Sequence, residues 1–300
     1  MASSLPKSLK STYPFESHYV KLKNGRTMHY ISEGSGETVL LLHGLPTWSF
    51  FFRNLILLLR NDFKCIAIDH IGYGLSDKPR RYSYGIKNHI DNAVQFAEVM
   101  KFRKFHIVSH DFGTAIALAM AERWPERISS MAVLNSATFV LPKLPAIILL
   151  FKFPLLTLLF ARVSNVFTRA CLHLGSFSIV QDNTSDGYLW PYRKFSDRAA
   201  ISADIDDIPW LQDHPSLDVL RPICDKAFIL GNKKIKFFWA EDDFRYSFDV
   251  LKAWAKVLPN AKYKRYQMTG HYLLDDSQEA INDIRTFLYS ARNVEKDLFK

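Results

Sequence analysis

Two patterns of apolar and polar positions alternate along most of the chain. Short, nearly continuous apolar runs are typical of strands that are buried on both faces of a parallel sheet. Strands are predicted at residues 18–22 and 26–32, which form a hairpin, and at 38–42, 63–69, 105–108, 128–134, 235–239 and 262–268. Between them, helices are predicted at residues 50–60, 88–100, 113–124, 247–257 and 279–291. Strands and helices that alternate in this way predict an α/β fold with a doubly wound, mostly parallel sheet.

The alternation is interrupted once, near Ala137. From there to about Pro215 the sequence has no clear strand pattern, many aromatic residues and several prolines. The α/β pattern resumes at Lys226–Leu230. We therefore predict a core that is formed by two parts of the chain, with a helical cap inserted between them: residues 1–136 and 216–300 for the core, and residues 137–215 for the cap.

The cap contains one unusually apolar stretch, residues 144–161, which is long enough to suggest a transmembrane segment. However, Lys152 lies at its middle, and Pro145 and Pro154 interrupt it. We therefore expect cap helices that line an apolar substrate tunnel. Peripheral membrane contact through this apolar cap is an open alternative, and the net charge of +9 would favour an anionic surface.

Charge, cysteine spacing and the N-terminal sequence indicate which binding partners and which cellular location to expect. The Lys and Arg residues are scattered and no nucleic-acid-binding motif accompanies them, so we expect no nucleic-acid partner. Cys65, Cys171 and Cys224 lack metal or redox spacing, and Cys65 is expected to be a small core residue. The N-terminus lacks the apolar region of a secretory signal. These features predict a cytoplasmic protein, peripheral at the membrane under the alternative above. They leave the oligomeric state open.

The most informative motif is Ser109-His110-Asp111-Phe112-Gly113, between a predicted strand and an Ala-rich helix. This is the layout of a nucleophile elbow, with Asp111 in the position usually occupied by Ser. Small residues flank the centre because the turn is strained and the neighbours must clear the backbone. Taken alone, Asp111 fits equally well as a plain helix N-cap.

Two further groups complete a catalytic pattern with Asp111. Asp243 and His271 each follow the carboxyl end of a predicted strand, where open parallel sheets bind their ligands. The order nucleophile, acid, histidine is the one found in α/β-hydrolases. Singly, Asp243 also fits a surface carboxylate and His271 a core imidazole. Together they predict a triad.

With these motifs the chain resembles α/β-hydrolases of the haloalkane dehalogenase and epoxide hydrolase branch over nearly its whole length. The matching segments are His43-Gly44-Leu45-Pro46, Asp69–Pro79, Ser109–Gly113, Trp239–Asp243 and Gly270-His271-Tyr272. A dehalogenase-like group that includes β-lactone decarboxylases of olefin biosynthesis is similar also at Pro46–Phe50, Pro191-Tyr192 and Asp207-Ile208-Pro209.

The resemblance implies a mechanism without metal or organic cofactor, on a small to medium, apolar, uncharged substrate. Asp111 would form a covalent ester, and His271, oriented by Asp243, would activate the water that hydrolyses it. The backbone N–H groups of Leu45 and Phe112 would form the oxyanion hole.

The sequence departs from the dehalogenases at two positions. Where these enzymes have Trp and Asn side chains that bind the departing halide, this chain has Phe112 and Leu45, whose side chains cannot donate hydrogen bonds. Tyr188, Trp190 and Tyr192 are the candidate leaving-group contacts in the cap. We therefore expect weak dehalogenation and better activity on strained oxygen rings, as an epoxide hydrolase or a β-lactone-cleaving decarboxylase. A non-catalytic binding protein of the same fold is a further alternative, which an intact triad disfavours.

Overall fold

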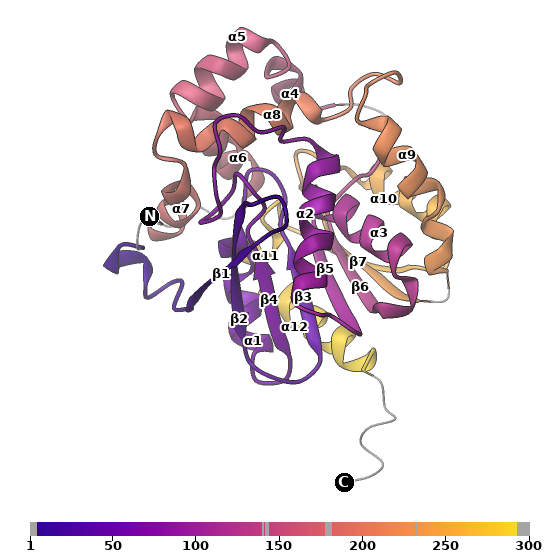
Figure 1. Ribbon diagram of the computed structural model, residues 1–300. Coiled ribbons are helices and arrows are strands. Elements are labelled where there is room, and N and C mark those ends of the chain that lie inside the picture. Colours follow the sequence, from indigo (N-terminus) through magenta and orange to yellow (C-terminus); the bar gives the residue numbers. More distant parts are fainter. Residues whose placement is uncertain (1–4, 140, 142–143, 178–181, 232, 293–300) are drawn as a thin grey trace.

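An eight-stranded sheet forms the centre of the molecule (Figure 1). The computed structural model describes residues 5–139, 141, 144–177, 182–231 and 233–292. The strand order is β1-β2-β4-β3-β5-β6-β7-β8, and all pairs are parallel except β1–β2 and β2–β4. The strands are β1 (Ser17–Lys21), β2 (Thr27–Glu33), β3 (Thr38–Leu42), β4 (Lys64–Ile68), β5 (Phe105–His110), β6 (Ile128–Leu134), β7 (Lys234–Ala240) and β8 (Lys262–Tyr266). The predicted mostly parallel α/β sheet is thus confirmed.

Helices cover both faces of this sheet (Figure 1). They are α1 (Arg53–Leu59), α2 (Ile86–Val99), α3 (Gly113–Arg123), α9 (Leu217–Asp225), α10 (Phe248–Val257), α11 (Leu273–Asp276) and α12 (Gln278–Ser290). Short 3₁₀ turns are η1 (Lys7–Leu9), η2 (Ser49–Phe52), η3 (Pro125–Arg127) and η7 (Ala227–Leu230). Helix α3 packs between α2 and α9, while α1 packs against α11 and α12.

The stretch Lys226–Leu230, where the strand–helix alternation was expected to resume, contains η7 instead of a strand. Ala227 and Leu230 are buried whereas Phe228 between them is exposed, a spacing of three that matches a 3₁₀ turn. Regular alternation therefore resumes only at β7.

Between β6 and α9 the chain forms a separate layer of helices over one end of the sheet (Figure 1). These are α4 (Ala146–Leu150), α5 (Pro154–Leu156), the π-helical segment η4 (Thr157–Val163), α6 (Val166–Gly175), α7 (Asp182–Leu189), η5 (Trp190–Tyr192), η6 (Phe195–Arg198) and α8 (Ala199–Asp207). We keep the name cap for residues 137–215.

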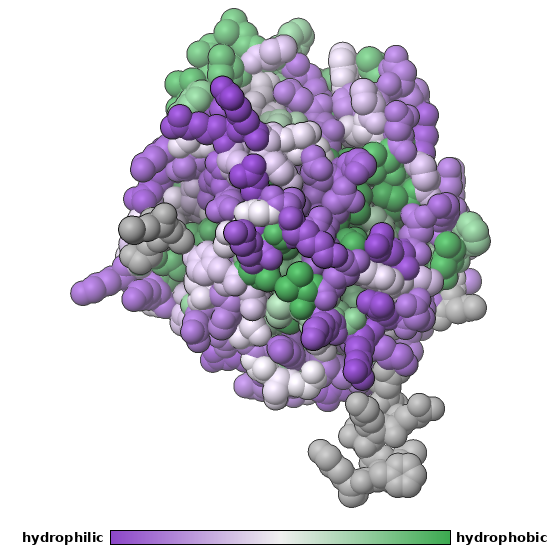
Figure 2. Space-filling model, viewed as in Figure 1, coloured by the Kyte–Doolittle hydropathy of each residue, from purple (hydrophilic) through white to green (hydrophobic). Residues whose placement is uncertain are grey.

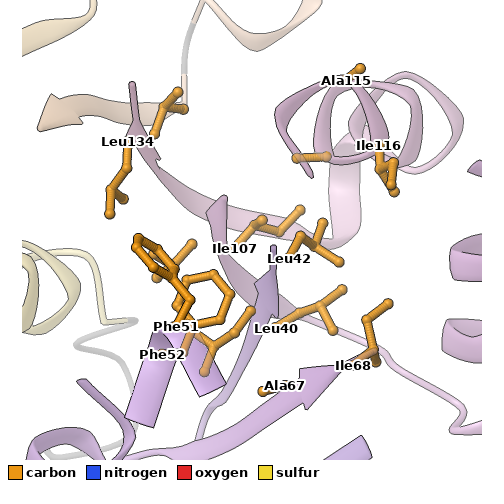
Figure 3. Packing of buried hydrophobic residues seen from close by; sticks show 14 of the residues in the cluster. Leu40, Leu42, Phe51, Phe52, Ala67, Ile68, Ile107, Ala115, Ile116 and Leu134 are labelled. Carbon is orange, nitrogen blue, oxygen red and sulfur yellow. The ribbon is translucent and has the colours of Figure 1, made fainter. Parts of the chain in front are cut away.

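The central strands are buried along nearly their whole length, as their continuous apolar runs predict. Leu40, Leu42 and Ile107 of β3 and β5 lie within a cluster that also contains Phe51 and Phe52 (Figure 3). Cys65 is fully buried in β4, and this burial raises the pKa of its thiol to about 12. A core role for this cysteine is thereby confirmed.

Asp69, directly after β4, fixes the loops at the carboxyl edge of the sheet. Its carboxylate accepts hydrogen bonds from His29 Nδ1 at 2.7 Å and from the backbone N–H groups of Ser49 and Leu75 at 2.8 Å. Burial alone would raise the pKa of Asp69, but its interactions with His29, His43 and the Leu75 N–H together outweigh burial and lower it to about 2. The charged carboxylate therefore ties β2, the start of η2 and the loop before α2 to one point.

Gly113 allows the closest approach between helix α3 and the sheet. A Cβ at this position would overlap the backbone carbonyl of Leu42 in β3, and a backbone group cannot move aside as a flexible side chain can. We expect Gly113→Ala to lower the free energy of unfolding by about 1–3 kcal/mol, as overpacked sites do.

Urea denaturation of purified protein tests this expectation, with Gly85→Ala as the matched control. A Cβ on Gly85 would come no closer than 3.7 Å to Asp207, an ordinary contact, so that the control should change stability by less than about 0.5 kcal/mol. Equal losses in the two variants would contradict the assigned role of Gly113.

Candidate active site

Asp111 occupies the turn between β5 and α3 in a left-handed conformation, with φ of 51°. A non-glycine residue adopts this conformation only where its surroundings hold it there. Its backbone N–H donates to the carbonyl of Asn135 at 3.1 Å. Gly44 leaves the room that the side chain needs, because a Cβ there would overlap the Asp111 side chain.

The Asp111 carboxylate is buried and accepts hydrogen bonds on both oxygens. Oδ2 accepts from the backbone N–H of Leu45 at 2.9 Å and from Arg245 Nη1 at 3.0 Å. Oδ1 accepts from the hydroxyl of Tyr246. The side chain does not cap helix α3. The arrangement is therefore that of a carboxylate held in position inside a pocket, and the plain N-cap interpretation does not apply.

Opposing effects set the ionisation of this group. Burial would raise the pKa of Asp111, but the charge of Arg245 and the smaller effects of His271, His110 and the Tyr246 hydrogen bond together outweigh burial and lower it to about 2. Burial raises the pKa of Tyr246 well above its ordinary value, so its hydroxyl stays protonated and acts as a donor. At neutral pH the centre thus contains a carboxylate anion, a guanidinium cation and a neutral phenol.

Asp243 and His271 lie together at the same edge of the sheet. His271 Nδ1 is 2.8 Å from Asp243 Oδ2, and both side chains are buried. The other ring nitrogen, Nε2, has no hydrogen-bond partner among the residues that the structure describes. The His271 ring lies 5.8 Å from the ring of Tyr246, whose hydroxyl contacts Asp111. The three predicted triad residues therefore meet around Tyr246.

Sequence reasoning missed Arg245 and Tyr246. Asp243 Oδ1 accepts the backbone N–H groups of these two residues at 2.7 and 3.2 Å, a tight turn that sends both side chains back toward Asp111. The available signal was an Arg and a Tyr two and three residues after an acid at the end of a predicted strand.

An apolar pocket opens from Asp111 into the cap. Its lining residues in the core are Leu45, Ile86, Asp111, Phe112, Ala115, Arg245 and Tyr246, and those in the cap or next to it are Ala137, Phe139, Leu141, Leu144, Pro145, Ile148, Asp207, Ile208, Pro209 and Leu220. Asp207 is already engaged by the Ile86 N–H at 2.7 Å and the Ser216 hydroxyl at 2.6 Å. The polar groups left to orient a ligand are therefore those around Asp111.

The three aromatic cap residues that were predicted to contact the leaving group lie elsewhere. Tyr188 donates to Asp275 at 2.5 Å, and the Tyr192 hydroxyl donates to the Thr47 carbonyl at 3.2 Å. Trp190 borders a different, polar hollow, where Arg193 stacks on its ring. The hydroxyl groups of Tyr188 and Tyr192 are thus engaged elsewhere, and none of the three residues lines the pocket that contains Asp111. Tyr246 of the core occupies that place.

The apolar stretch 144–161 has a first part that lines the pocket and a later part that is exposed. Leu144, Pro145 and Ile148 line the pocket, as expected for a tunnel. Leu155 and Leu158, which belong to the same stretch that we expected to line a tunnel, are 66% and 42% exposed. Composition alone does not tell which side of a short apolar helix is buried, and here the later part faces outward.

Two further features of the described part of the chain bear on whether it could cross a membrane or hold a metal ion. No single helix there has both the length and the apolar character needed to cross a membrane. The helices Pro154–Val163 and Val166–Gly175 meet that criterion only as a pair, which is bent by 84° at its break. No group of three or more His, Cys, Asp or Glu side chains is arranged there to hold a metal ion.

Comparisons of the sequence and of the structure with known proteins indicate the same family. The family model described as "alpha/beta hydrolase fold" matches residues 37–278. The chain is 31% identical to a cis-3-alkyl-4-alkyloxetan-2-one decarboxylase of Shewanella oneidensis, covering 93% of this chain and 90% of that protein. It is 26% identical to the enzyme of the same name in Xanthomonas campestris, with 92% and 97% covered.

Haloalkane dehalogenases are similar over a shorter part of the sequence but over most of the fold. Haloalkane dehalogenase 2 of Mycobacterium tuberculosis is 36% identical over 41% of this chain and 43% of its own length. The crystal structure of haloalkane dehalogenase DatA from Agrobacterium tumefaciens superimposes with a TM-score of 0.83 at 20% identity, covering 92% of this chain and 97% of that one. The chain belongs to the α/β-hydrolase fold family, in the group of enzymes that includes the haloalkane dehalogenases and the alkyloxetanone decarboxylases.

Proposed function

We propose that this enzyme uses Asp111 to open the four-membered ring of a dialkyl oxetan-2-one and releases an alkene and carbon dioxide. The observation that carries the proposal is the Arg245 guanidinium, 3.0 Å from Asp111 at the base of an otherwise apolar pocket. The similarity to oxetanone decarboxylases over nearly the whole chain supports it.

In the first step, Asp111 Oδ1 attacks the saturated, alkyl-bearing ring carbon that is bonded to the ring oxygen, not the carbonyl carbon. The bond between that carbon and the ring oxygen breaks, its electrons stay on the oxygen, and the former lactone becomes a carboxylate beside an aspartyl ester. Arg245 is suited to that carboxylate because a planar guanidinium pairs with its two oxygens better than with a spherical halide. Arg245 thus supplies the donor that the side chains of Phe112 and Leu45 cannot provide.

In the second step, the bond between the carboxylate and its carbon breaks and its electrons form the carbon–carbon double bond. The ester bond to Asp111 breaks at the same time, and its electrons return to Asp111 as carboxylate. This fragmentation consumes neither water nor a proton. A carboxylate whose pKa is lowered to about 2 is a good leaving group, and the Leu45 N–H, Arg245 and Tyr246 are the groups that receive its charge.

A second candidate is hydrolysis of the same aspartyl ester, and the pair formed by His271 and Asp243 at 2.8 Å favours it. His271 Nε2 would take a proton from a water that attacks the ester carbonyl, and the oxyanion would form at the N–H groups of Leu45 and Phe112. A lactone would then give a hydroxy acid. An epoxide would give a diol, with Tyr246 as the proton donor to the leaving oxygen.

Product analysis tests the proposed reaction. We expect wild-type enzyme to convert cis-3,4-dialkyl oxetan-2-ones into alkene and carbon dioxide, measured by gas chromatography, and to turn over 1-bromoalkanes far more slowly. Asp111→Asn should lower alkene formation about 10³-fold or more because a neutral amide replaces the carboxylate nucleophile. Hydroxy acid as the main product would favour the hydrolytic candidate, and rapid bromide release would contradict both.

His271→Phe separates the two candidates, because only hydrolysis requires the activated water. For the proposed fragmentation we expect alkene formation to continue and no aspartyl adduct to accumulate in intact-protein mass spectra. A stoichiometric adduct on the peptide that contains Asp111 would instead identify hydrolysis. Thermal melting of the variant provides the control for folding.

Arg245→Met should both slow the reaction and change its pH dependence. Loss of the guanidinium removes the partner of the developing carboxylate, which we expect to lower kcat about 10²–10³-fold. The pKa of Asp111 is about 2 in the wild type, so Asp111 stays ionised above pH 4. Without Arg245, burial raises the pKa of Asp111. As the pH is lowered, the variant should therefore lose activity at a higher pH than the wild type does.

The measurement is a profile of kcat/KM between about pH 4 and pH 8. Arg285→Met is the control, because Arg285 forms a surface ion pair with Asp62 at 2.8 Å, away from the pocket. Wild type should show no acid limb from Asp111 in this range, and a profile of Arg245→Met that also lacks one would refute the assigned role of the guanidinium.

A further inference from the structure

The outer side of the cap carries an exposed apolar surface. We define the apolar cap face by the exposed side chains of Leu150, Phe153, Leu155, Leu158, Leu159 and Val163, on α4, α5 and η4 and beside them. Phe153 and Leu155 are 64% and 66% exposed. Hydrophobic residues gather over the same helices at the top of Figure 2, above a mostly polar surface. Contiguous apolar surface of this kind on a monomer marks a site of interaction.

The segment that carries this face is basic, and acidic side chains come only from neighbouring segments, such as Asp206 of α8, which interacts with Lys152. Between Glu126 and Asp182 the sequence contains no acidic residue, whereas Lys152, Arg162 and Arg169 lie within that segment. Two copies of the chain that met through this face would bring basic surfaces together, which opposes self-association. An anionic lipid surface is complementary to both the apolar side chains and the positive charge.

The geometry fits a helix that lies in a membrane interface. The two arms, Pro154–Val163 and Val166–Gly175, meet at 84°. Each arm has ten residues and is therefore about 15 Å long, half the thickness of a bilayer core. The second arm is fixed to the enzyme, because Phe167 and Leu172 are buried and the Gly175 carbonyl accepts the N–H of Tyr272 at 2.9 Å. The first arm remains at the surface.

The apolar cap face follows directly along the chain from residues that line the pocket. Leu144, Pro145 and Ile148 line the pocket, and Leu150 and Phe153 follow in the same stretch of chain on the outside. We propose that this face docks on an anionic lipid membrane and that apolar substrate passes from the lipid into the pocket beside α4. The docking step does not rest on the proposed reaction, since it can be measured without substrate.

Vesicle sedimentation tests the proposal with full-length protein. We expect wild type to sediment with phosphatidylcholine vesicles that contain phosphatidylglycerol, and much less with pure phosphatidylcholine or at high salt. Phe153→Ser combined with Leu155→Ser should weaken the partitioning about tenfold or more. The matched control is Phe228→Ser, since Phe228 is 70% exposed on η7, which packs on α3 and α9 rather than in the cap.

Three results would overturn the proposal. The first is no sedimentation of wild type with anionic vesicles. The second is an equal loss of partitioning in the double variant and in the control. The third is a wild-type dimer in light scattering that the double variant loses without any vesicle binding, which would assign the face to a second copy of the chain. Melting temperatures of both variants show whether they are folded.

Discussion

Burial of the negative charge of Asp111 is the constraint on which the arrangement of this site depends. An ionised carboxylate removed from water is costly unless hydrogen bonds and an opposite charge surround it. The Leu45 N–H, Arg245 and Tyr246 meet that requirement, and they come from the loops after β3 and β7, while Asp111 itself follows β5. One buried charge thereby holds three loops at the carboxyl edge of the sheet in a defined relation.

A second carboxylate extends the same network. Asp243 binds the backbone N–H groups of Arg245 and Tyr246 with one oxygen and His271 with the other. It therefore aims the cation and the phenol at Asp111 and also orients the imidazole. A change at Asp243 would disturb the ionisation of Asp111 as well as the position of His271, so the site behaves as one unit.

The sequence predicts this fold well where a pattern has one physical meaning. The bounds of β3 and β6 agree with the prediction because a short, mostly apolar run between turn residues is too short for a typical buried helix and fits a buried strand. The position of Asp111 could be predicted because its motif requires small residues for steric reasons. Gly113 is an example, since a Cβ there would overlap the backbone of β3. Arg245, Tyr188 and Leu155 were not predictable in the same way. The direction of each side chain depends on a tertiary contact that leaves no periodic pattern in the sequence. Arg245 is directed by the tight turn at Asp243, Tyr188 by its hydrogen bond to Asp275, and Leu155 by the packing of a short helix.

The low pKa of Asp111 has opposite consequences for the two steps of the proposed reaction. A carboxylate that is stabilised to a pKa of about 2 is a weak nucleophile, so it requires an electrophile that is itself activated. A four-membered lactone supplies that activation through ring strain, whereas an unstrained haloalkane does not. The same stabilisation makes Asp111 a good leaving group, which fragmentation requires and hydrolysis does not, because water cleaves the ester at its carbonyl carbon. The charge arrangement around Asp111 therefore favours a strained oxygen ring that opens and fragments.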